Sequence, residues 1–196
     1  MTAPRLQAVL FDMDGLLIDS EPQWFAAETA TVAALGSAWG KAQQLDLLGS
    51  NLPFAAEYMV RFTNTELSAS EVETLLSDNM TEQLRGVLSF QEGAMELLDE
   101  LASAGITLGL VTSSTREHAD VVLEKLPPSL FAVTVTADDV SKLKPHPMPY
   151  LTALAALEVS ATNAIVLEDS PPGVASGKAA GCHVVAVPSV AAIAPG

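Results

Sequence analysis

From residue 92 onward, short apolar runs alternate with segments whose apolar residues recur at helical spacing. Residues 92–105 show that spacing and close on Gly105, a residue that commonly ends helices. The run ITLGLV at 106–111 follows, and its length and composition are typical of a buried strand. The alternation then continues. We predict further helices over 116–126, 147–158 and 171–181, and further strands over 131–136, 163–168 and 183–187.

One more apolar run, LQAVLF at 6–11, lies near the N-terminus and is followed at once by acids and Gly15. It also predicts a buried strand. Strands that alternate with helices favour a parallel sheet with helices on both faces, joined by right-handed crossovers. The sequence therefore predicts an α/β fold with a Rossmann-like, doubly wound parallel sheet.

Residues 20–87 do not continue this alternation. They contain helical patterns, and the Ser-Ala-Ser that begins at Ser68 resembles a helix N-cap. We predict that this segment is an inserted small α-helical cap domain over the sheet, and that residues 1–19 and 88–196 form the Rossmann-like catalytic core. The predicted cap helices lie at 21–36, 52–62 and 68–86, and the predicted hinges lie near 16–20 and 85–91.

Composition and charge narrow the possible partners. The chain has 196 residues, of which 49% are apolar, so it can build a core for one domain with a smaller insertion. Nine basic and 24 acidic residues give a net charge of −15, and we expect no binding to nucleic acid or to an anionic membrane surface. No apolar run reaches membrane-spanning length, and a single cysteine allows no internal disulfide. We expect a cytoplasmic protein.

Polar residues follow four of the predicted strands at the point where each strand ends. Because the carboxyl ends of parallel strands meet at one edge of the sheet, these side chains should lie close together. Some of the hydroxyls could simply cap helices, but capping does not explain several acids at adjacent strand ends. The residues are Asp12 and Asp14 after the first strand, Thr112 to Ser114 after the second, Asp138 and Asp139 with Lys144 just beyond after the third, and Glu168 and Asp169 after the fourth.

Carboxylates brought together at such an edge would repel one another and tend to take up protons. A hard divalent cation removes that conflict, and oxygen ligands suit Mg²⁺. The cation would also supply positive charge for an anionic substrate on a protein that is acidic overall. The sequence therefore predicts a magnesium site at this edge.

Four motifs in this order resemble those of the haloacid dehalogenase superfamily. They are FDMDGLLIDS at 11–20, VTSS at 111–114, KPHP at 144–147 and LEDSPPGVASGKAAG at 167–181. The helical insertion lies where the helical-cap, β-phosphoglucomutase-like subgroup has its cap, and the pattern is most similar to that of sugar- and polyol-phosphate phosphatases. The resemblance covers essentially the whole chain. It implies a Mg²⁺-dependent phosphatase, a monomer, that hydrolyses small phosphate monoesters.

The resemblance also implies catalytic roles. Asp12 would be the nucleophile that forms an aspartyl-phosphate. Asp14 would be the general acid and base, and its backbone carbonyl would ligate the metal. Asp12 and Asp169 would be the carboxylate ligands of Mg²⁺. Glu168 would bind the metal or metal-bound water, or would lie beside a helix N-cap.

Substrate-binding roles follow in the same way. Thr112 and Ser113, with the backbone N–H groups at the start of the next helix, would hold phosphate oxygens. Lys144 would neutralise charge on the phosphate and on Asp12. Trp24 in the first cap helix could pack against the substrate, although a core position is the more common role for such a residue.

Three functions compete. A phosphatase is the first, and a β-phosphoglucomutase-type intramolecular phosphotransferase is the alternative. A non-catalytic binding module is disfavoured because every residue that the chemistry needs is present. A mutase would need cationic groups in the cap for a second phosphate, but Trp24 stands where β-phosphoglucomutases carry a histidine. Residues 20–87 contain only three basic residues against nine acids, so we predict release of free phosphate from sugar or polyol monophosphates.

Residues outside the motifs are expected to have structural roles. Cys182 is interpreted as a small buried hydrophobe. His118, His146 and His183 are expected at the surface or at helix ends. Met148 stands where the family usually has an Asp after KPxP, and we expect this difference to alter the start of the following helix without affecting the chemistry.

Overall fold

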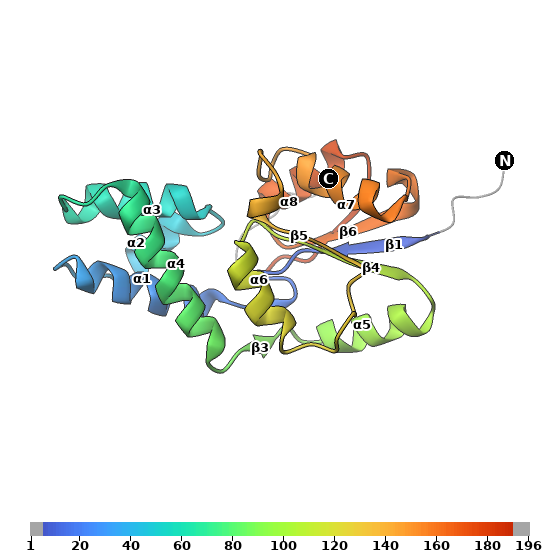
Figure 1. Ribbon diagram of the computed structural model, residues 1–196, viewed down its shortest axis with the longest axis horizontal. Helices are drawn as coiled ribbons and strands as arrows, with labels where there is room; N and C mark the ends of the chain where they lie inside the picture. The colour runs from blue at the N-terminus through green and yellow to red at the C-terminus, as the bar shows by residue number, and fades with distance from the viewer. Residues whose placement is uncertain (1–5, 190–196) are drawn as a thin grey trace. The chain divides into compact units, whose positions relative to one another are not determined.

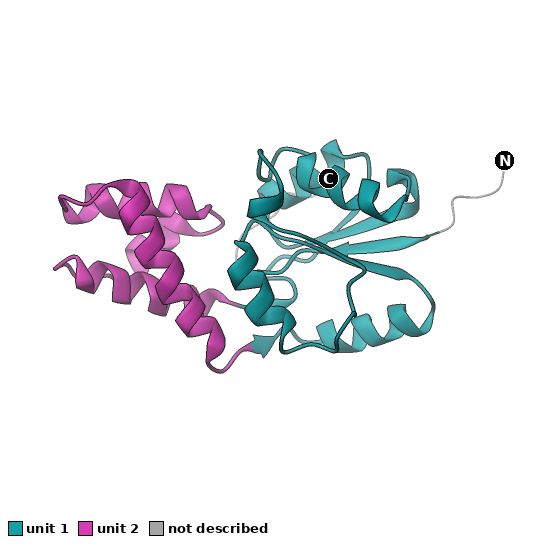
Figure 2. Ribbon diagram, in the orientation of Figure 1, with its two compact units in different colours: residues 1–19, 89–196 teal, residues 20–88 magenta. Residues whose placement is uncertain are grey.

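The computed structural model describes residues 6–189 and divides the chain into two compact units. Unit 1 comprises residues 1–19 and 89–196, and unit 2 comprises residues 20–88 (Figure 2). The second boundary lies one residue beyond the predicted one. Residues 1–5 and 190–196 of the predicted core lie outside the described residues.

Unit 1 contains a five-stranded sheet in the order β5-β4-β1-β6-β7 (Figure 1). Every neighbouring pair of strands in it is parallel, which confirms the predicted α/β class. The strand that comes first in the sequence is therefore central. The strands are β1 (Ala8–Phe11), β4 (Thr107–Val111), β5 (Val133–Val135), β6 (Ala164–Glu168) and β7 (His183–Ala186).

Helices cover both faces of this sheet. In Figure 1, α5 and α6 lie on one face and α7 and α8 on the other, as a doubly wound sheet requires. The helices are α5 (Ala94–Ser103), α6 (Arg116–Leu123), α7 (Met148–Leu157) and α8 (Pro171–Ala179). Two short 3₁₀ turns, Ala137–Asp139 and Ala161–Asn163, precede α7 and β6 and were not predicted.

The central strand β1 is buried on both sides, with every residue at most 2% exposed. Such a strand must be apolar throughout, because helices cover both of its faces. The neighbouring strand leaves room for it at Gly109, where a Cβ atom would lie 2.7 Å from Leu10 Cδ2. This close packing fixes β1, and with it the two acids that follow.

The predicted hinges contain a two-stranded antiparallel pair, β2 (Ile18–Asp19) and β3 (Ser89–Phe90). Ile18 pairs with Phe90, and Asp19 pairs with Ser89. The Gln91 side chain donates to the Gly15 carbonyl at 3.0 Å, which ties the second connection to the loop after β1. Strands of two residues carry too little pattern to be predicted from sequence.

Unit 2 is helical, as predicted. Its longest helix begins with a capping box in which Ser68 accepts from the Glu71 N–H and Glu71 accepts from the Ser68 N–H. The helices are α1 (Glu21–Ala34), α2 (Lys41–Leu47), α3 (Leu52–Thr63) and α4 (Ala69–Arg85). Helix α2 was not predicted, because in seven residues it buries only Leu47. No helix among the described residues is both long and apolar enough to cross a bilayer.

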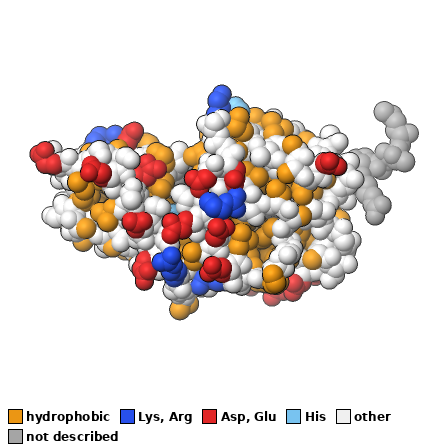
Figure 3. Space-filling model, viewed as in Figure 1, with side chains coloured by type: hydrophobic (Ala, Val, Ile, Leu, Met, Phe, Trp, Pro, Cys, Tyr) orange, Lys and Arg blue, Asp and Glu red, His pale blue; other side chains and the backbone are white. Residues whose placement is uncertain are grey.

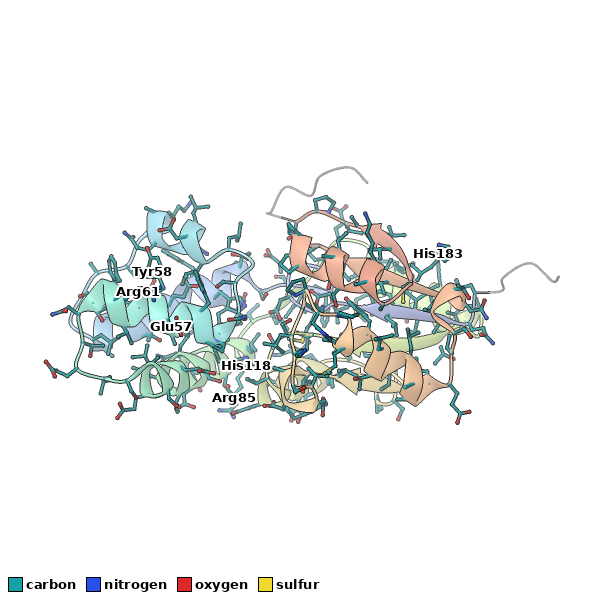
Figure 4. All side chains as sticks on the ribbon, turned by 90° about the horizontal axis from the view of Figure 1, so that it is seen from above. Glu57, Tyr58, Arg61, Arg85, His118 and His183 are labelled. Atoms are coloured by element: carbon teal, nitrogen blue, oxygen red, sulfur yellow. The ribbon has the colours of Figure 1, made fainter. Side chains whose placement is uncertain are left out.

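The histidines agree with the expected surface or helix-end positions. His118 is buried, at 1% exposed, but lies in the first turn of α6, where its backbone N–H donates to the N-cap Thr115 (Figure 4). His183 is exposed. The Nδ1 atom of His146 accepts a hydrogen bond from the Met148 N–H at 3.1 Å, at the start of α7. His146 thus caps a helix that lacks the usual Asp after KPxP.

A buried acid lies inside unit 2. Glu28 on α1 is 5% exposed, and the Trp39 indole N–H donates to its Oε2 atom at 2.9 Å. Burial raises the pKa of Glu28 to about 7, although the hydrogen bond from Trp39 opposes the shift. In the unfolded chain the same carboxyl titrates near 4.5. Between these two values the folded state therefore binds more protons than the unfolded state.

This difference predicts that unit 2 loses stability as pH rises from about 4.5 to about 7, and that stability levels off above that range. Glu28→Gln keeps an oxygen for Trp39 and removes the charge. At pH 8 it should raise the free energy of unfolding, by at most about 3 kcal/mol at 1.36 kcal/mol per pKa unit. Both tryptophans lie in unit 2, so tryptophan fluorescence in urea at several pH values measures this unit alone.

The control for this measurement is Glu57→Gln on α3, which removes an exposed carboxylate that pairs with Arg61 (Figure 4). An exposed pair contributes little to stability, so this variant should follow the wild-type pH curve. Parallel curves for Glu28→Gln and the wild type would show that Glu28 is already ionised in the folded protein.

Candidate active site

Three carboxylates meet at the carboxyl edge of the sheet. Phe11 pairs with Leu167 in the register of β1 and β6, so the residues that follow, Asp12 and Glu168, leave the sheet side by side. Asp169 comes next. One carboxylate oxygen from each of the three acids lies within 4.8 Å of the other two. The edge predicted from the sequence is thus assembled around these three acids.

Lys144 is the cation of this cluster. Its Nζ atom donates to Asp12 Oδ1 at 2.6 Å, to Glu168 Oε1 at 2.6 Å and to the Val111 carbonyl at 2.8 Å. These three acceptors lie at the ends of the neighbouring strands β1, β6 and β4. The side chain is only 5% exposed. Burial alone would lower the pKa of Lys144, but the two carboxylates outweigh burial and raise it, so the amine stays charged.

One lysine does not balance three acids. Burial and the neighbouring Glu168 raise the pKa of Asp12 well above its usual range, and Lys144 only partly opposes this shift. Burial likewise raises the pKa of Asp169 to about 6, although a hydrogen bond from Ser189 opposes it. The cluster is therefore short of positive charge.

Glu168 is held on every side. It is fully buried, and its Oε1 atom accepts from the Tyr150 hydroxyl at 2.6 Å as well as from Lys144. Its Oε2 atom accepts from the Ser170 hydroxyl at 3.1 Å. Burial raises the pKa of Tyr150 well above its usual range, so the phenol keeps the proton that it donates. Both oxygens of Glu168 are thus engaged by protein groups.

Two glycines make room for the acids. A Cβ atom at Gly173, in the first turn of α8, would lie 1.9 Å from the Glu168 carboxylate. A Cβ atom at Gly15 would lie 2.1 Å from Asp169 Oδ2, and the φ of +81° at that residue also favours glycine. The Ser189 hydroxyl donates to the same Asp169 oxygen at 2.6 Å. No other residue type fits at 15 or 173 without displacing a carboxylate.

Asp14 faces the second strand end. Its Oδ2 atom accepts from the Ser114 hydroxyl at 2.7 Å and lies 3.5 Å from the Thr112 hydroxyl. Asp14 and Ser113 are partly exposed, whereas Thr112 is buried. The Asp14 carboxylate does not belong to the three-acid cluster. The carboxylate faces the hydroxyls that follow β4, which suits a chemical role different from that of Asp12.

Trp24, the remaining predicted site residue, lies on α1 in unit 2 and is half-buried. Its predicted contact with substrate stays a prediction.

Sequence reasoning missed several residues of this site. Ser189 and Tyr150 lie outside the motifs, and Gly173 lies inside one but was given no role. The Arg116 guanidinium contacts Asp139, and the Arg116 backbone N–H donates to Asp138 at 2.6 Å. The two acids after β5 therefore bind the first residue of α6 and do not join the three-acid cluster. Buried carboxylates need hydrogen-bond donors, so the sequence could have predicted that hydroxyl groups lie nearby. It could not have shown which residues supply them.

The acid cluster fits a divalent cation. Oxygens on opposite sides of Mg²⁺ are about 4.2 Å apart, and the three carboxylate oxygens of this cluster lie within 4.8 Å of one another. Among the described residues, protein donors engage Oδ1 of Asp12 and Oδ2 of Asp169, which leaves the other oxygen of each carboxylate for a metal. The deficit of positive charge supports the same assignment. Glu168 fits a supporting position better, because protein donors engage both of its oxygens.

Comparison with known proteins gives consistent matches. The family model described as haloacid dehalogenase-like hydrolase matches residues 9–187. The chain is 34% identical to validoxylamine A 7'-phosphate phosphatase of Streptomyces hygroscopicus subsp. limoneus, over 91% of this chain and 84% of that protein. It is 32% identical to hexitol phosphatase B of Escherichia coli K12, over 96% and 87%. The crystal structure of CbbY from Rhodobacter sphaeroides with phosphate superposes with a TM-score of 0.82 at 27% identity, covering 93% and 86%.

Proposed function

The chain belongs to the haloacid dehalogenase-like hydrolase family, and from that premise we propose that it is a Mg²⁺-dependent phosphatase of small sugar or polyol monophosphates. The observation that carries the proposal is the set of contacts around Lys144, which joins Asp12 to Glu168 within the cluster that contains Asp169. This arrangement combines a nucleophile, a fixed cation and ligands for a metal at one edge of the sheet.

In the proposed first step, Asp12 is the nucleophile. A carboxylate oxygen attacks phosphorus, the bond from phosphorus to the ester oxygen breaks, and its electron pair goes to the leaving alcohol. Lys144 holds Asp12 in place at 2.6 Å and neutralises charge on it. The product is an aspartyl-phosphate.

Asp14 is the proposed acid and base. It gives a proton to the leaving alkoxide, then takes one from the water that attacks the aspartyl-phosphate, which restores Asp12 and releases phosphate. The hydrogen bond from Ser114 at 2.7 Å orients its carboxylate. A group with this role must be free to move apart from Asp12, and its contacts with the hydroxyls that follow β4 allow that.

Binding of the phosphoryl group is assigned to Thr112, Ser113 and Lys144. The backbone N–H groups of Arg116 and His118 at the start of α6, which the sequence suggested as further donors, already donate to Asp138 and Thr115. Mg²⁺ is assigned to Asp12, Asp169 and the Asp14 backbone carbonyl, with Glu168 supporting. When bound, the metal would supply positive charge that the phosphoryl group and the acids need.

The composition of unit 2 favours a neutral leaving group. Its basic residues Lys41, Arg61 and Arg85 are all exposed, and the two arginines contact Glu57 and Glu82 on their own helices. On the face drawn in Figure 3, basic side chains lie among acidic ones. Such a unit is poorly suited to hold the second phosphate of a mutase. We assign Trp24 to packing against the sugar or polyol.

The test is release of inorganic phosphate from a panel of hexitol and sugar monophosphates, with Mg²⁺ or with excess chelator, beside a coupled assay for interconversion of glucose 1- and 6-phosphates. We expect phosphate release that depends on Mg²⁺ and no interconversion. Full activity in chelator would contradict the metal assignment. Mutase turnover well above phosphate release, with a bisphosphate primer present, would favour the phosphotransferase.

A further inference from the structure

Tyr150 lies on α7, outside the four motifs, and is fully buried. Its ring belongs to the core cluster of unit 1 with Ala153, Leu154 and Val166. A phenylalanine would fill that space equally well. The hydroxyl, however, leaves the apolar core and donates to Glu168 Oε1 at 2.6 Å. A buried phenol oxygen needs such a partner, and here the partner belongs to the acid cluster.

The same side chain contacts Lys144. The Nζ atom lies over the Tyr150 ring, 5.0 Å from its centroid, within the range of a cation–π interaction. Glu168 Oε1 accepts from both Nζ and the Tyr150 hydroxyl, each at 2.6 Å. Tyr150 thus contacts both members of the ion pair, the carboxylate through its hydroxyl and the ammonium group through its ring.

We propose that Tyr150 is a positioning residue that holds Lys144 on Asp12 by sharing Glu168 Oε1. The inference rests on the proposed function, because it assigns Tyr150 to the same site.

The physical argument concerns the three N–H donors of Lys144. They serve Asp12, Glu168 and the Val111 carbonyl. With the phenol present, Glu168 Oε1 has a second, neutral donor and does not depend on Lys144 alone. Without it, the buried carboxylate has lost a hydrogen bond, and its attraction for Nζ increases. Since Nζ already lies 2.6 Å from Glu168 Oε1, the released carboxylate and the amine then shift together, away from Asp12.

Hydrogen bonds hold the segment between Lys144 and Tyr150 in place. Lys144 and Tyr150 are six residues apart, and the His146 carbonyl accepts from the buried Ser176 hydroxyl of α8 at 2.7 Å. Together with the cap on the Met148 N–H, this bond fixes where α7 begins. Tyr150 is therefore anchored independently of Lys144, as a residue that positions another must be.

The experiment compares Tyr150→Phe with the wild type, using p-nitrophenyl phosphate and Mg²⁺. Tyr150→Phe keeps the ring and removes only the hydroxyl. We expect kcat to fall by at least about 10-fold, as happens when a hydrogen-bond partner of a residue in a metal site is removed. KM should change by less than about two-fold. The control is Thr31→Val, which removes a buried hydroxyl that donates to the Ala27 carbonyl in unit 2. Its kcat should stay within about two-fold of the wild type.

Crystal structures of the wild type and Tyr150→Phe give a readout that does not depend on activity. We expect the distance from Lys144 Nζ to Asp12 Oδ1 to lengthen beyond hydrogen-bonding range in the variant. An unmoved Nζ, or a kcat within two-fold of the wild type, would overturn the proposal. If Tyr150→Phe does not fold, Tyr150→Met, which fills the space with a flexible side chain, takes its place with the same expectations.

The two hypotheses fail separately. A wild-type protein that hydrolyses no phosphate ester in the presence of Mg²⁺ would contradict the proposed function. The movement of Lys144 between the two crystal structures would still decide whether Tyr150 positions it.

Discussion

Asp12→Asn should abolish phosphate release, with a loss of at least about 10⁴-fold, the scale seen when a covalent nucleophile is removed. The amide keeps the shape of the carboxylate and an oxygen for Lys144, but its nitrogen and oxygen are too weak as nucleophiles to attack phosphorus. The measurement is phosphate release from a hexitol phosphate, together with mass spectrometry of acid-quenched enzyme. Phosphate bound to the peptide that contains residue 12 should be found in the wild type only.

A matched control makes the same chemical change elsewhere in unit 1. Asp99→Asn on α5 alters an exposed carboxylate, so it should leave phosphate release and folding unchanged. If Asp12→Asn retained the wild-type rate, or if mass spectrometry found the phosphate on another residue of the wild type, Asp12 could not be the nucleophile.

Asp14→Asn should lower kcat by about 10²–10⁴-fold, the usual contribution of general acid–base catalysis, and should change KM little. The amide oxygen can still accept from Ser114, so the local geometry should persist. The two steps that use Asp14 can be separated by the leaving group. p-Nitrophenolate is stable enough to leave as an anion, whereas the alkoxide of a polyol must receive a proton as it leaves.

With p-nitrophenyl phosphate, the variant should therefore release a burst of about one p-nitrophenol per enzyme and then turn over slowly, because water still needs a base. With a polyol phosphate there should be no burst. A normal kcat combined with a raised KM would assign Asp14 to binding. A burst with both substrates would show that another group is the acid.

Much of the fold could be predicted because the three central strands β1, β4 and β6 are buried on both faces. Such strands must be apolar runs, and helices must separate them, so the pattern predicts them and the alternation extends to the two edge strands. The acids of the site follow those runs directly. That these acids meet at one edge follows from a parallel sheet, whereas the pairing of β1 with β6, which brings Asp12 beside Glu168, was not predicted.

The features that the sequence did not predict depend on contacts between residues far apart in the chain. Tyr150 has the spacing of a core residue, and nothing in its neighbours along the chain shows that its hydroxyl reaches Glu168. The acids after β5 looked equivalent to those after β1 and β6, but Arg116 holds Asp138 and Asp139 at the start of α6. Short elements such as α2 and β2 bury too few residues to leave a pattern.

The pairing of β2 with β3 has an evolutionary consequence. Asp19 and Ser89 are direct partners in that ladder, so the 69 residues between them leave the sheet-containing unit and return to it at one place. An insertion whose two ends are neighbours can be lengthened, shortened or exchanged without changing the strand order of its host. A chimera that joins residues 1–19 and 89–196 to the insertion of a relative should therefore keep the five-stranded sheet and the acids at its edge. The insertion can change during evolution while the three-acid cluster stays in place.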